Sequence, residues 1–168
     1  MKANAVALAL ALAALAAGSA LAAHRAVPHG PLRFEDFPAA SYSGPRHAPD
    51  YSGKSRHYRT FRTLIRNGFA GNELFAGRYA LFGAGCGTDC VSYILGDLKT
   101  GHLTDFPLGG ETNADLTLQY RPNSRLVKAQ WNVAEDNGSD SCQSEDLVWN
   151  GASFKSGPPR SAPGRCPN

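Results

Sequence analysis

The stretch RYALFGAGCGTDCVSYILGDLKTGHLTDF, residues 78–106, decides the expected fold. Its first five residues alternate in hydrophobicity, residues 91–95 are β-branched and aromatic, and residues 102–106 are expected to form the returning strand,. Asp97-Leu98-Lys99-Thr100-Gly101 has the composition of a tight hairpin turn, because Gly101 can adopt the positive φ that such turns need. The stretch therefore predicts short strands that follow one another in an antiparallel sheet.

The same pattern continues toward the C-terminus. Strand-like segments are expected at 116–120 and 126–131, hinged at residues 121–124. The strongest hairpin signal is Asn150-Gly151, which lies between Leu147-Val148-Trp149 and Ala152-Ser153-Phe154,. The even spacing predicts a mainly β fold, either a single antiparallel meander or a small sandwich of about six to seven short strands.

One helix is expected before the strands, over residues 55–67. Tyr58, Phe61, Leu64 and Ile65 share one face of it, while arginines occupy the remainder,. Ser55 or Ser52 would begin the helix, and Gly68 would end it. A basic amphipathic helix can bind membranes or acidic partners. The simpler interpretation, which we favour, is a helix that packs on the sheet and leaves its arginines in solvent.

The chain divides into four segments by composition. Residues 1–22 have the three parts of a cleavable signal peptide: Lys2, an apolar run, and Ala20-Leu21-Ala22,. Residues 23–53 are predicted to form an extended arm rich in proline and glycine. Residues 54–156 form the β-rich domain with its N-terminal helix, and residues 157–168 form a tail tied by Cys166. A periplasmic or secreted protein with no transmembrane anchor after cleavage is expected.

The chain has four cysteines, which are Cys86, Cys90, Cys142 and Cys166. An even number in an exported protein indicates two disulfides rather than zinc ligands or a thiolate nucleophile. Three pairings are possible. Proximity in the sequence favours Cys86–Cys90 together with Cys142–Cys166.

Charge is distributed unevenly along the chain. The formal net charge is +3, which is too small to suggest a nucleic-acid partner,. Residues 24–66 nevertheless hold eight basic and three acidic side chains. This segment could steer an anionic partner, although such segments more often dock on an acidic body or remain solvated.

The unusual local feature is the segment 83–90, Gly-Ala-Gly-Cys-Gly-Thr-Asp-Cys. A glycine-rich loop closed by a disulfide presents backbone N–H groups at a low entropic cost. Gly85, Gly87, Thr88 and Asp89 are therefore the candidate binding residues of an inhibitor-like or envelope-associated module, whose partner would be an envelope protein or a polysaccharide. The competing interpretation is a tight connection between strands, in which glycine only satisfies the backbone geometry.

No catalytic motif stands out, and no metal or cofactor site is predicted. The alternative function is a small extracytoplasmic hydrolase of cell-wall or secreted substrates that uses Asp89, Asp97 or His102. Asp97 and Asp105 flank one hairpin and could form a carboxylate pair, although exposed turn acids are more usual. Residues 136–140 have oxygen ligands but lack the spacing of a calcium loop, so an ordinary polar turn is favoured.

Several of these motifs together resemble a family of small exported bacterial proteins without an assigned activity. The resemblance covers roughly residues 42–155. It rests on Phe75-Ala76-Gly77-Arg78-Tyr79, Gly85–Cys90, Asp97–Gly101, Tyr120–Leu126 and Val148–Gly151. Two positions depart from the family pattern: Glu73-Leu74 stands for Pro-Asn, and Ala84 stands for a tryptophan. The resemblance implies a fold and a compartment but no chemistry.

Overall fold

The computed structural model describes residues 31–167. The predicted signal peptide, residues 1–22, lies outside the described residues, as do residues 23–30 of the predicted arm. No helix within residues 31–167 is long and apolar enough to cross a membrane.

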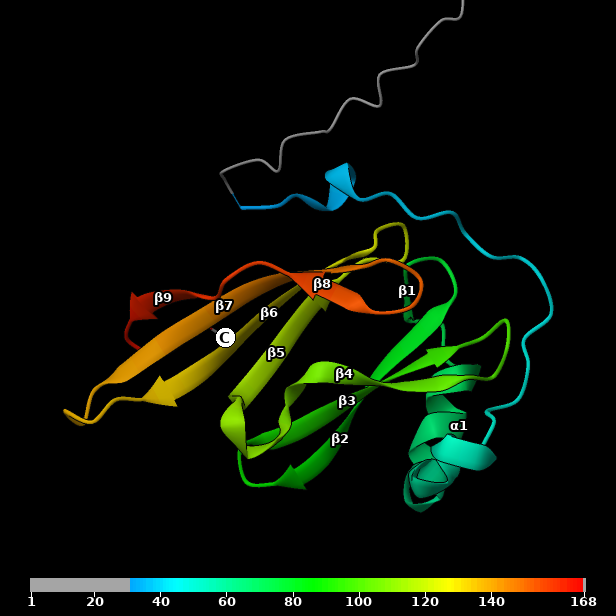
Figure 1. Ribbon diagram of the computed structural model, residues 1–168, viewed down its shortest axis with the longest axis horizontal. Coiled ribbons are helices and arrows are strands. Elements are labelled where there is room, and N and C mark those ends of the chain that lie inside the picture. The colour runs from blue at the N-terminus through cyan, green and yellow to red at the C-terminus, as the bar shows by residue number, and fades with distance from the viewer. Residues whose placement is uncertain (1–30, 168) are drawn as a thin grey trace, which may run out of the picture.

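Two antiparallel sheets face each other, which confirms the expected mainly β fold and its sandwich form (Figure 1). The first sheet has the order β1-β2-β3-β4, and the second has the order β5-β6-β7-β8, with β9 also paired to β7. Residues 31–167 thus contain more strands than the six to seven expected from the sequence. The strands are β1 (Leu74–Phe75), β2 (Tyr79–Gly87), β3 (Cys90–Asp97), β4 (Leu103–Gly109), β5 (Ala114–Tyr120), β6 (Leu126–Ala134), β7 (Asp140–Trp149), β8 (Phe154–Ser156) and β9 (Arg160–Pro163).

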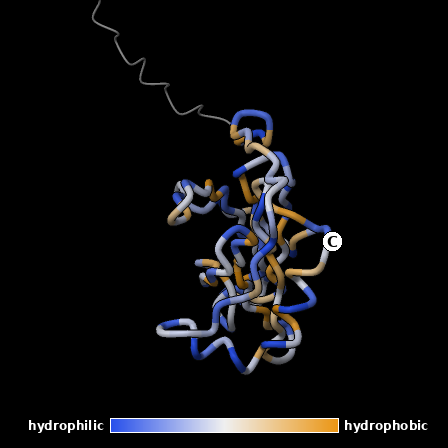
Figure 2. Tube along the Cα trace, turned by 90° about the vertical axis from the view of Figure 1, so that its right-hand side faces the viewer, coloured by the Kyte–Doolittle hydropathy of each residue, from blue (hydrophilic) through white to orange (hydrophobic). Residues whose placement is uncertain are grey.

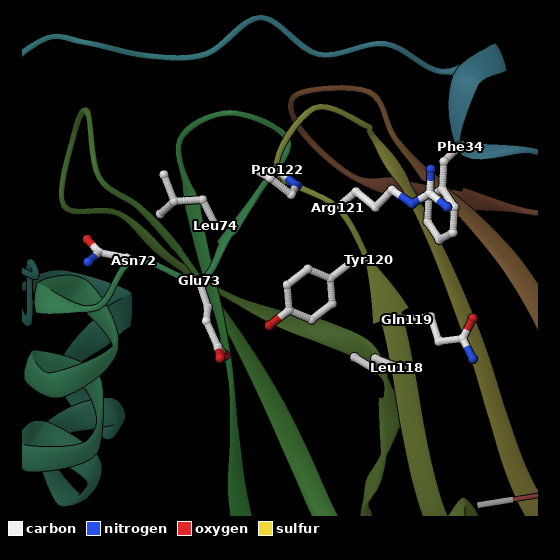
Figure 3. Close-up of a pocket in the computed structure, with 9 residues that line it drawn as sticks. All are labelled: Phe34, Asn72, Glu73, Leu74, Leu118, Gln119, Tyr120, Arg121 and Pro122. Atoms are coloured by element: carbon white, nitrogen blue, oxygen red, sulfur yellow. The ribbon is translucent and has the colours of Figure 1, made fainter.

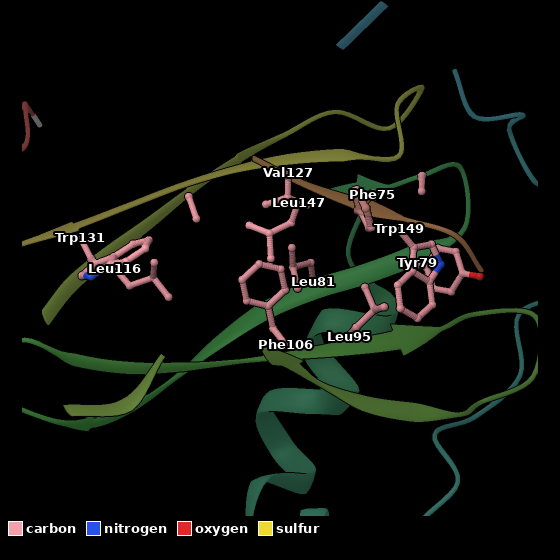
Figure 4. Close-up of a cluster of buried hydrophobic side chains, with 12 residues drawn as sticks. Phe75, Tyr79, Leu81, Leu95, Phe106, Leu116, Val127, Trp131, Leu147 and Trp149 are labelled. Atoms are coloured by element: carbon pink, nitrogen blue, oxygen red, sulfur yellow. The ribbon is translucent and has the colours of Figure 1, made fainter. Parts of the chain in front are cut away.

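The first sheet is covered on both faces, because alternate residues of β2 and β3 point to opposite sides. Leu81 and Leu95 are paired in register and point toward the second sheet, where they meet Val127 and Leu147 (Figure 4). Their neighbour Ile94 points the other way and packs against Ile65 and Phe69. These two residues belong to the helical segment, residues 53–70. Hydrophobic residues consequently gather along the middle of the molecule and hydrophilic ones at its outer loops (Figure 2).

The expected helix forms before the strands and packs on the first sheet, but its first half and its ends differ from the prediction. The segment consists of a 3-10 helix, η2 (Gly53–Phe61), followed by an α-helix, α1 (Arg62–Ala70). Gly68 does not end the helix, which continues until Gly71. The reason is packing, since a Cβ on Gly68 would lie 2.5 Å from the Phe82 ring. Glycine is used here for a close approach to β2 rather than for a left-handed conformation.

The arm runs along one end of the sandwich before it reaches the helical segment (Figure 1). It includes a short 3-10 turn, η1 (Phe34–Asp36), and a second such turn, η3 (Gly110–Thr112), connects β4 to β5. Along the length of the arm, its backbone N–H groups donate to carbonyl groups of the β-rich domain. These bonds are Ala39 to Asn123 (2.9 Å), Tyr42 to Gly77 (3.0 Å), His47 to Leu98 (2.8 Å) and Asp50 to Gly101 (2.8 Å).

Gly77 and Gly101 allow the arm to approach the sheet closely. A Cβ on Gly77 would lie 1.9 Å from the Ala40 carbonyl oxygen, and one on Gly101 would lie 2.2 Å from the Ala48 oxygen. Both residues have φ of +79°, a conformation that favours glycine. The turn predicted at residues 97–101 is therefore confirmed, and it also serves as a docking point for the arm.

We expect Gly77→Ala to detach the arm from the body. The substitution combines backbone strain at positive φ with a collision against Ala40. Gly138 has φ of +78° with no atom within 4 Å of an added Cβ, so Gly138→Ala is a matched control that should lose only about 1–2 kcal/mol from the backbone strain. Hydrogen exchange at the Tyr42 amide should accelerate in Gly77→Ala alone. Equal exchange in both variants would contradict the docking role of Gly77.

The C-terminal tail is held by both a strand and a disulfide. β9 pairs with the first half of β7, from Ser141↔Pro163 to Ser144↔Arg160. The Cys142–Cys166 disulfide forms beside this ladder, and Cys86–Cys90 forms at the end of β2. Both are the pairs that proximity in the sequence favoured, and no cysteine of the described chain is free.

Candidate functional site

Most of the predicted loop 83–90 is β-strand, which corrects its expected conformation. Gly83–Gly87 form the last part of β2, so only Thr88 and Asp89 lie between β2 and β3. Gly83 is paired with Tyr93 and Ala84 with Ser92, while a bulge follows at Gly85–Gly87. The segment is thus a hairpin tip whose end is bridged by the disulfide.

The four candidate binding residues lie together at this tip, and all of them are exposed. Gly87 has φ of +146° and Asp89 has φ of +56°. The Asp89 carbonyl accepts a hydrogen bond from the Asp115 N–H at 2.9 Å. This bond joins the tip to β5 of the second sheet, so the tip is fixed at both its disulfide and its turn.

A groove lies beside the tip, on the face of the first sheet that carries the helical segment. Its volume is about 390 Å³. Its floor includes Ala84, Cys86 and Ser92, and one wall is formed by η2, with His57, Tyr58 and Phe61. The remaining wall is the end of β4, from Asp105 to Gly109.

The groove exists because the helical segment covers only part of the sheet. Ile65 and Phe69 of α1 pack on Ala80, Ile94 and their neighbours. Farther along the same strands, toward the disulfide, the residues on this face are small and no helix lies above them. This part of the sheet therefore forms an open groove floor, on which the side chains of Ala84, Cys86 and Ser92 are small.

Phe61 lies at the rim of the groove and has an exposed fraction of 39%, the single exposed large hydrophobic side chain among the described residues. Phe61 was expected on the face of the helix that packs on the sheet, and this expectation is wrong. The sheet residues opposite it are small, so no side chain covers its ring. Aromatic residues, phenylalanine included, are enriched at protein interfaces, so Phe61 marks this rim as a candidate contact surface.

Tyr58 and Asp105 supply the polar chemistry of the groove. The Tyr58 hydroxyl donates to Asp105 Oδ1 at 2.7 Å. Burial raises the pKa of Tyr58, and the bond to Asp105 raises it further. The His57 ring lies over Tyr58, with 3.9 Å between ring centroids, and its Nδ1–H donates to the Lys54 carbonyl at 2.8 Å. Tyr58 therefore stays protonated and holds Asp105 in place as a hydrogen-bond acceptor.

The residues considered for a hydrolase do not meet in one cleft. Asp97 and His102 line a pocket of about 270 Å³ near Trp149, but Asp89 precedes the opposite end of β3. Eight strand residues separate the two ends, which corresponds to roughly 25 Å. Asp97 Oδ2 lies 3.2 Å from Arg78, and its Oδ1 accepts from the Lys99 N–H.

The possible carboxylate pair of Asp97 and Asp105 is not formed. Asp105 is paired with Ile94, so it lies on the helix face of the sheet. Asp97 lies on the face of Leu95, which points toward the second sheet. The two acids therefore belong to opposite faces, as the period of two in a strand requires.

Residues 136–139 belong to a polar turn between β6 and β7, and Asp140 is the first residue of β7. The Gly138 N–H donates to the Glu135 carbonyl, and the Ser139 N–H donates to Asn137 Oδ1, each at 2.9 Å. Within residues 31–167, no three acidic, histidine or cysteine side chains are grouped so that they could hold a metal ion.

Another pocket, of about 550 Å³, lies between β1 and β5 (Figure 3). Glu73 and Tyr120 point into it, but the Tyr120 hydroxyl already donates to the Leu81 carbonyl at 3.2 Å. At its far side Arg121 lies over the Phe34 ring, with 4.4 Å from Cζ to the centroid, and pairs with Glu35. Arg121 is thus engaged in attaching the arm and the Tyr120 hydroxyl in a bond to β2, which makes this pocket a weaker candidate.

No family model, no curated protein and no solved structure matches this chain. The groove residues Tyr58, Phe61, Ser92 and Asp105 were not among the candidate binding residues taken from the sequence. One signal was present in the alternation of β2 and β3, which places the small residues Ala84 and Ser92 on the face of Ile94. That Ala84 and Ser92 lie directly opposite each other in the β2–β3 pair became evident only from the strand register.

Proposed function

We propose that this chain is an exported, disulfide-stabilised binding module that acts through the 83–90 hairpin tip and the adjacent groove. The observation that carries the proposal is the groove of about 390 Å³ with Phe61 exposed at its rim. The inhibitor-like or envelope-associated role is proposed from the disulfide-bridged tip beside this groove, and the resemblance to small exported proteins supports only the exported location. Two disulfides support a periplasmic or secreted location, because disulfides persist in oxidising compartments.

The chemistry of the groove suits a partner that inserts a side chain or a sugar ring. The rim supplies an aromatic surface, and the floor is small and partly apolar. Asp105 and the Ser92 hydroxyl supply polar contacts at the bottom. A few polar groups placed in a largely apolar concave surface are the usual composition of binding pockets. An envelope protein or a polysaccharide is the partner that we propose.

Ser92→Trp is expected to abolish partner binding without unfolding the domain. Ser92 is exposed in β3, and a tryptophan there would fill the groove floor. Ser156→Trp is the matched control, since Ser156 is an exposed serine in β8, away from the groove lining. Envelope extract passed over the native protein and both variants, followed by mass spectrometry, should show the same captured partner for the native protein and Ser156→Trp only.

The role of the tip is tested separately with Cys86→Ser/Cys90→Ser. We expect weaker capture, because the tip loses the cross-link that orders it before binding. If the folded Ser92→Trp protein captures its partner as well as the native protein does, the groove is not the binding site. If the cysteine variant also binds unchanged, the tip has no role.

A further inference from the structure

The helical segment carries a run of positive charge that nothing in the described chain neutralises. Residues 53–72 contain no aspartate or glutamate. All of their cationic side chains are exposed, and none of them forms an ion pair with residues 31–167. These residues are Lys54, Arg56, Arg59, Arg62 and Arg66.

Most arginines elsewhere in the described chain form ion pairs. Each of these arginines has a carboxylate oxygen within 3.5 Å: Arg33, Arg78, Arg121, Arg160 and Arg165. Arg46 is also engaged, since its guanidinium donates to the carbonyls of Phe69 and Gly71 at the end of α1. Arg125 likewise donates to the carbonyls of Pro38 and Trp149. Within the helical segment, Arg62 Nε donates to the Arg59 carbonyl at 3.3 Å. Among the described residues, this segment is therefore where cations are concentrated without a carboxylate partner.

Three of these arginines line a groove. It has a volume of about 470 Å³ and lies between the helical segment and the arm. Arg59, Arg62 and Arg66 form one wall, and the arm forms the other with Ala48, Pro49 and Tyr51.

The arm wall is held in place by the body. The Asp50 N–H donates to Gly101, and the Tyr51 hydroxyl donates to the Arg62 carbonyl at 3.4 Å. Asp50 is the carboxylate nearest in sequence to this wall, and its Oδ1 accepts from the Ser52 N–H at 2.8 Å. No carboxylate is among the residues that line the groove.

Like charges three and four residues apart on a helix repel one another. An anion in the groove would remove this repulsion and would accept charge-assisted hydrogen bonds from planar guanidinium groups. The spacing extends the site along the helical segment, because the three 3-10 steps from Arg59 to Arg62 and the four α-helical steps from Arg62 to Arg66 rise about 12 Å together,. This length is comparable to that of a disaccharide, so the groove suits an extended anion rather than a single small ion.

We propose that this groove binds an acidic polysaccharide, with the arginines on its carboxylate or phosphate groups and Tyr51 against a sugar ring. A flat membrane fits less well, because the apolar face of the helix is packed on the sheet and cannot insert,. Single-stranded nucleic acid sites stack successive bases on several aromatic side chains, whereas Tyr51 is the aromatic residue lining this groove. The site uses different residues from the groove at Phe61, so it stands or falls independently of the proposed function.

The test uses the full oxidised chain and a hexasaccharide of galacturonic acid, with a dextran oligomer of equal length as the neutral control. Arg59→Gln/Arg62→Gln/Arg66→Gln removes the groove charges. Arg33→Gln/Lys99→Gln/Lys155→Gln removes the same net charge from exposed positions elsewhere. The arginine substitutions are on solvent-facing positions, so both proteins should remain folded, which near-ultraviolet circular dichroism will verify.

By calorimetry, the native protein should bind the acidic hexasaccharide and not dextran, with affinity that falls as salt is raised. The groove variant should lose about tenfold or more in affinity, and the control variant should lose much less. Equal losses in the two variants would show attraction to net charge and overturn the site. The proposal is also overturned if the native protein does not bind the hexasaccharide. Tighter binding of an oligothymidine or of phosphatidylglycerol vesicles would assign the groove to that ligand instead.

Discussion

Phe75→Ala is expected to lower the free energy of unfolding by about 3–5 kcal/mol, as for other fully buried phenylalanines. Phe75 has an exposed fraction of 0% and lies in β1, at the end of the core between the two sheets. Its ring contacts the rings of Tyr79, Tyr120 and Phe154, with centroids 6.3, 6.1 and 6.0 Å away. These residues come from β2, β5 and β8, so the cavity would loosen both sheets at once.

Phe61→Ala is the matched control for this measurement. The same atoms are removed, but from a side chain that is 39% exposed, so the loss should stay below about 1 kcal/mol. Urea unfolding followed by tryptophan fluorescence gives both values. If the two variants lost comparable free energy of unfolding, Phe75 of β1 would not be a central part of the core.

Removing the Cys142–Cys166 disulfide is the second substitution with a large expected effect. The two cysteines are 24 residues apart, so Cys142→Ser/Cys166→Ser should lower the free energy of unfolding by about 3.5 kcal/mol in the chain-entropy model. Cys86 and Cys90 are four residues apart, and the corresponding loss for Cys86→Ser/Cys90→Ser is about 2 kcal/mol. The longer closed loop restricts the unfolded chain more.

The two cysteine variants also differ in where they should loosen the protein. Without Cys166, the tail keeps the β7–β9 ladder and the hydrogen bond from Gln130 to the Pro167 carbonyl. Because these contacts are no longer backed by a covalent link, β9 should open more often, and hydrogen exchange should accelerate at Arg160, Ser161 and Ala162 in this variant. In the other variant it should accelerate only at the hairpin tip. If the short disulfide proved to contribute more stability than the long one, the tip would have a structural role beyond shaping a binding surface.

The sequence indicated the elements whose signals are local. Alternation at residues 78–82 and the run at 91–95 correspond to β2 and β3. The turn before His102 and the hairpin at Asn150-Gly151 both form. Such signals are sufficient because strand alternation and turn geometry depend on residues that are close in the chain.

Elements that are stabilised only by distant partners were missed. β9 lies in a segment rich in proline and glycine, and it becomes a strand because β7 offers a free edge beside Cys142. The first half of β7 is polar and carries no strand pattern, yet it is paired with β6 along its whole length. Gly68 lies inside α1, where its missing side chain leaves room for Phe82, which is fourteen residues farther along the chain.

The candidate site was found only in part for the same reason. By itself, the sequence determined the mainly β class and favoured the disulfide pairs that form, and it singled out the segment 83–90 that carries one of them. The tertiary structure decided that this segment is a hairpin tip, that a groove opens beside it, and that the arm forms a wall of the arginine-lined groove. Those features depend on strand register and on the area of sheet that the helical segment leaves uncovered. Both are set by contacts between residues far apart in the chain, which no local pattern records.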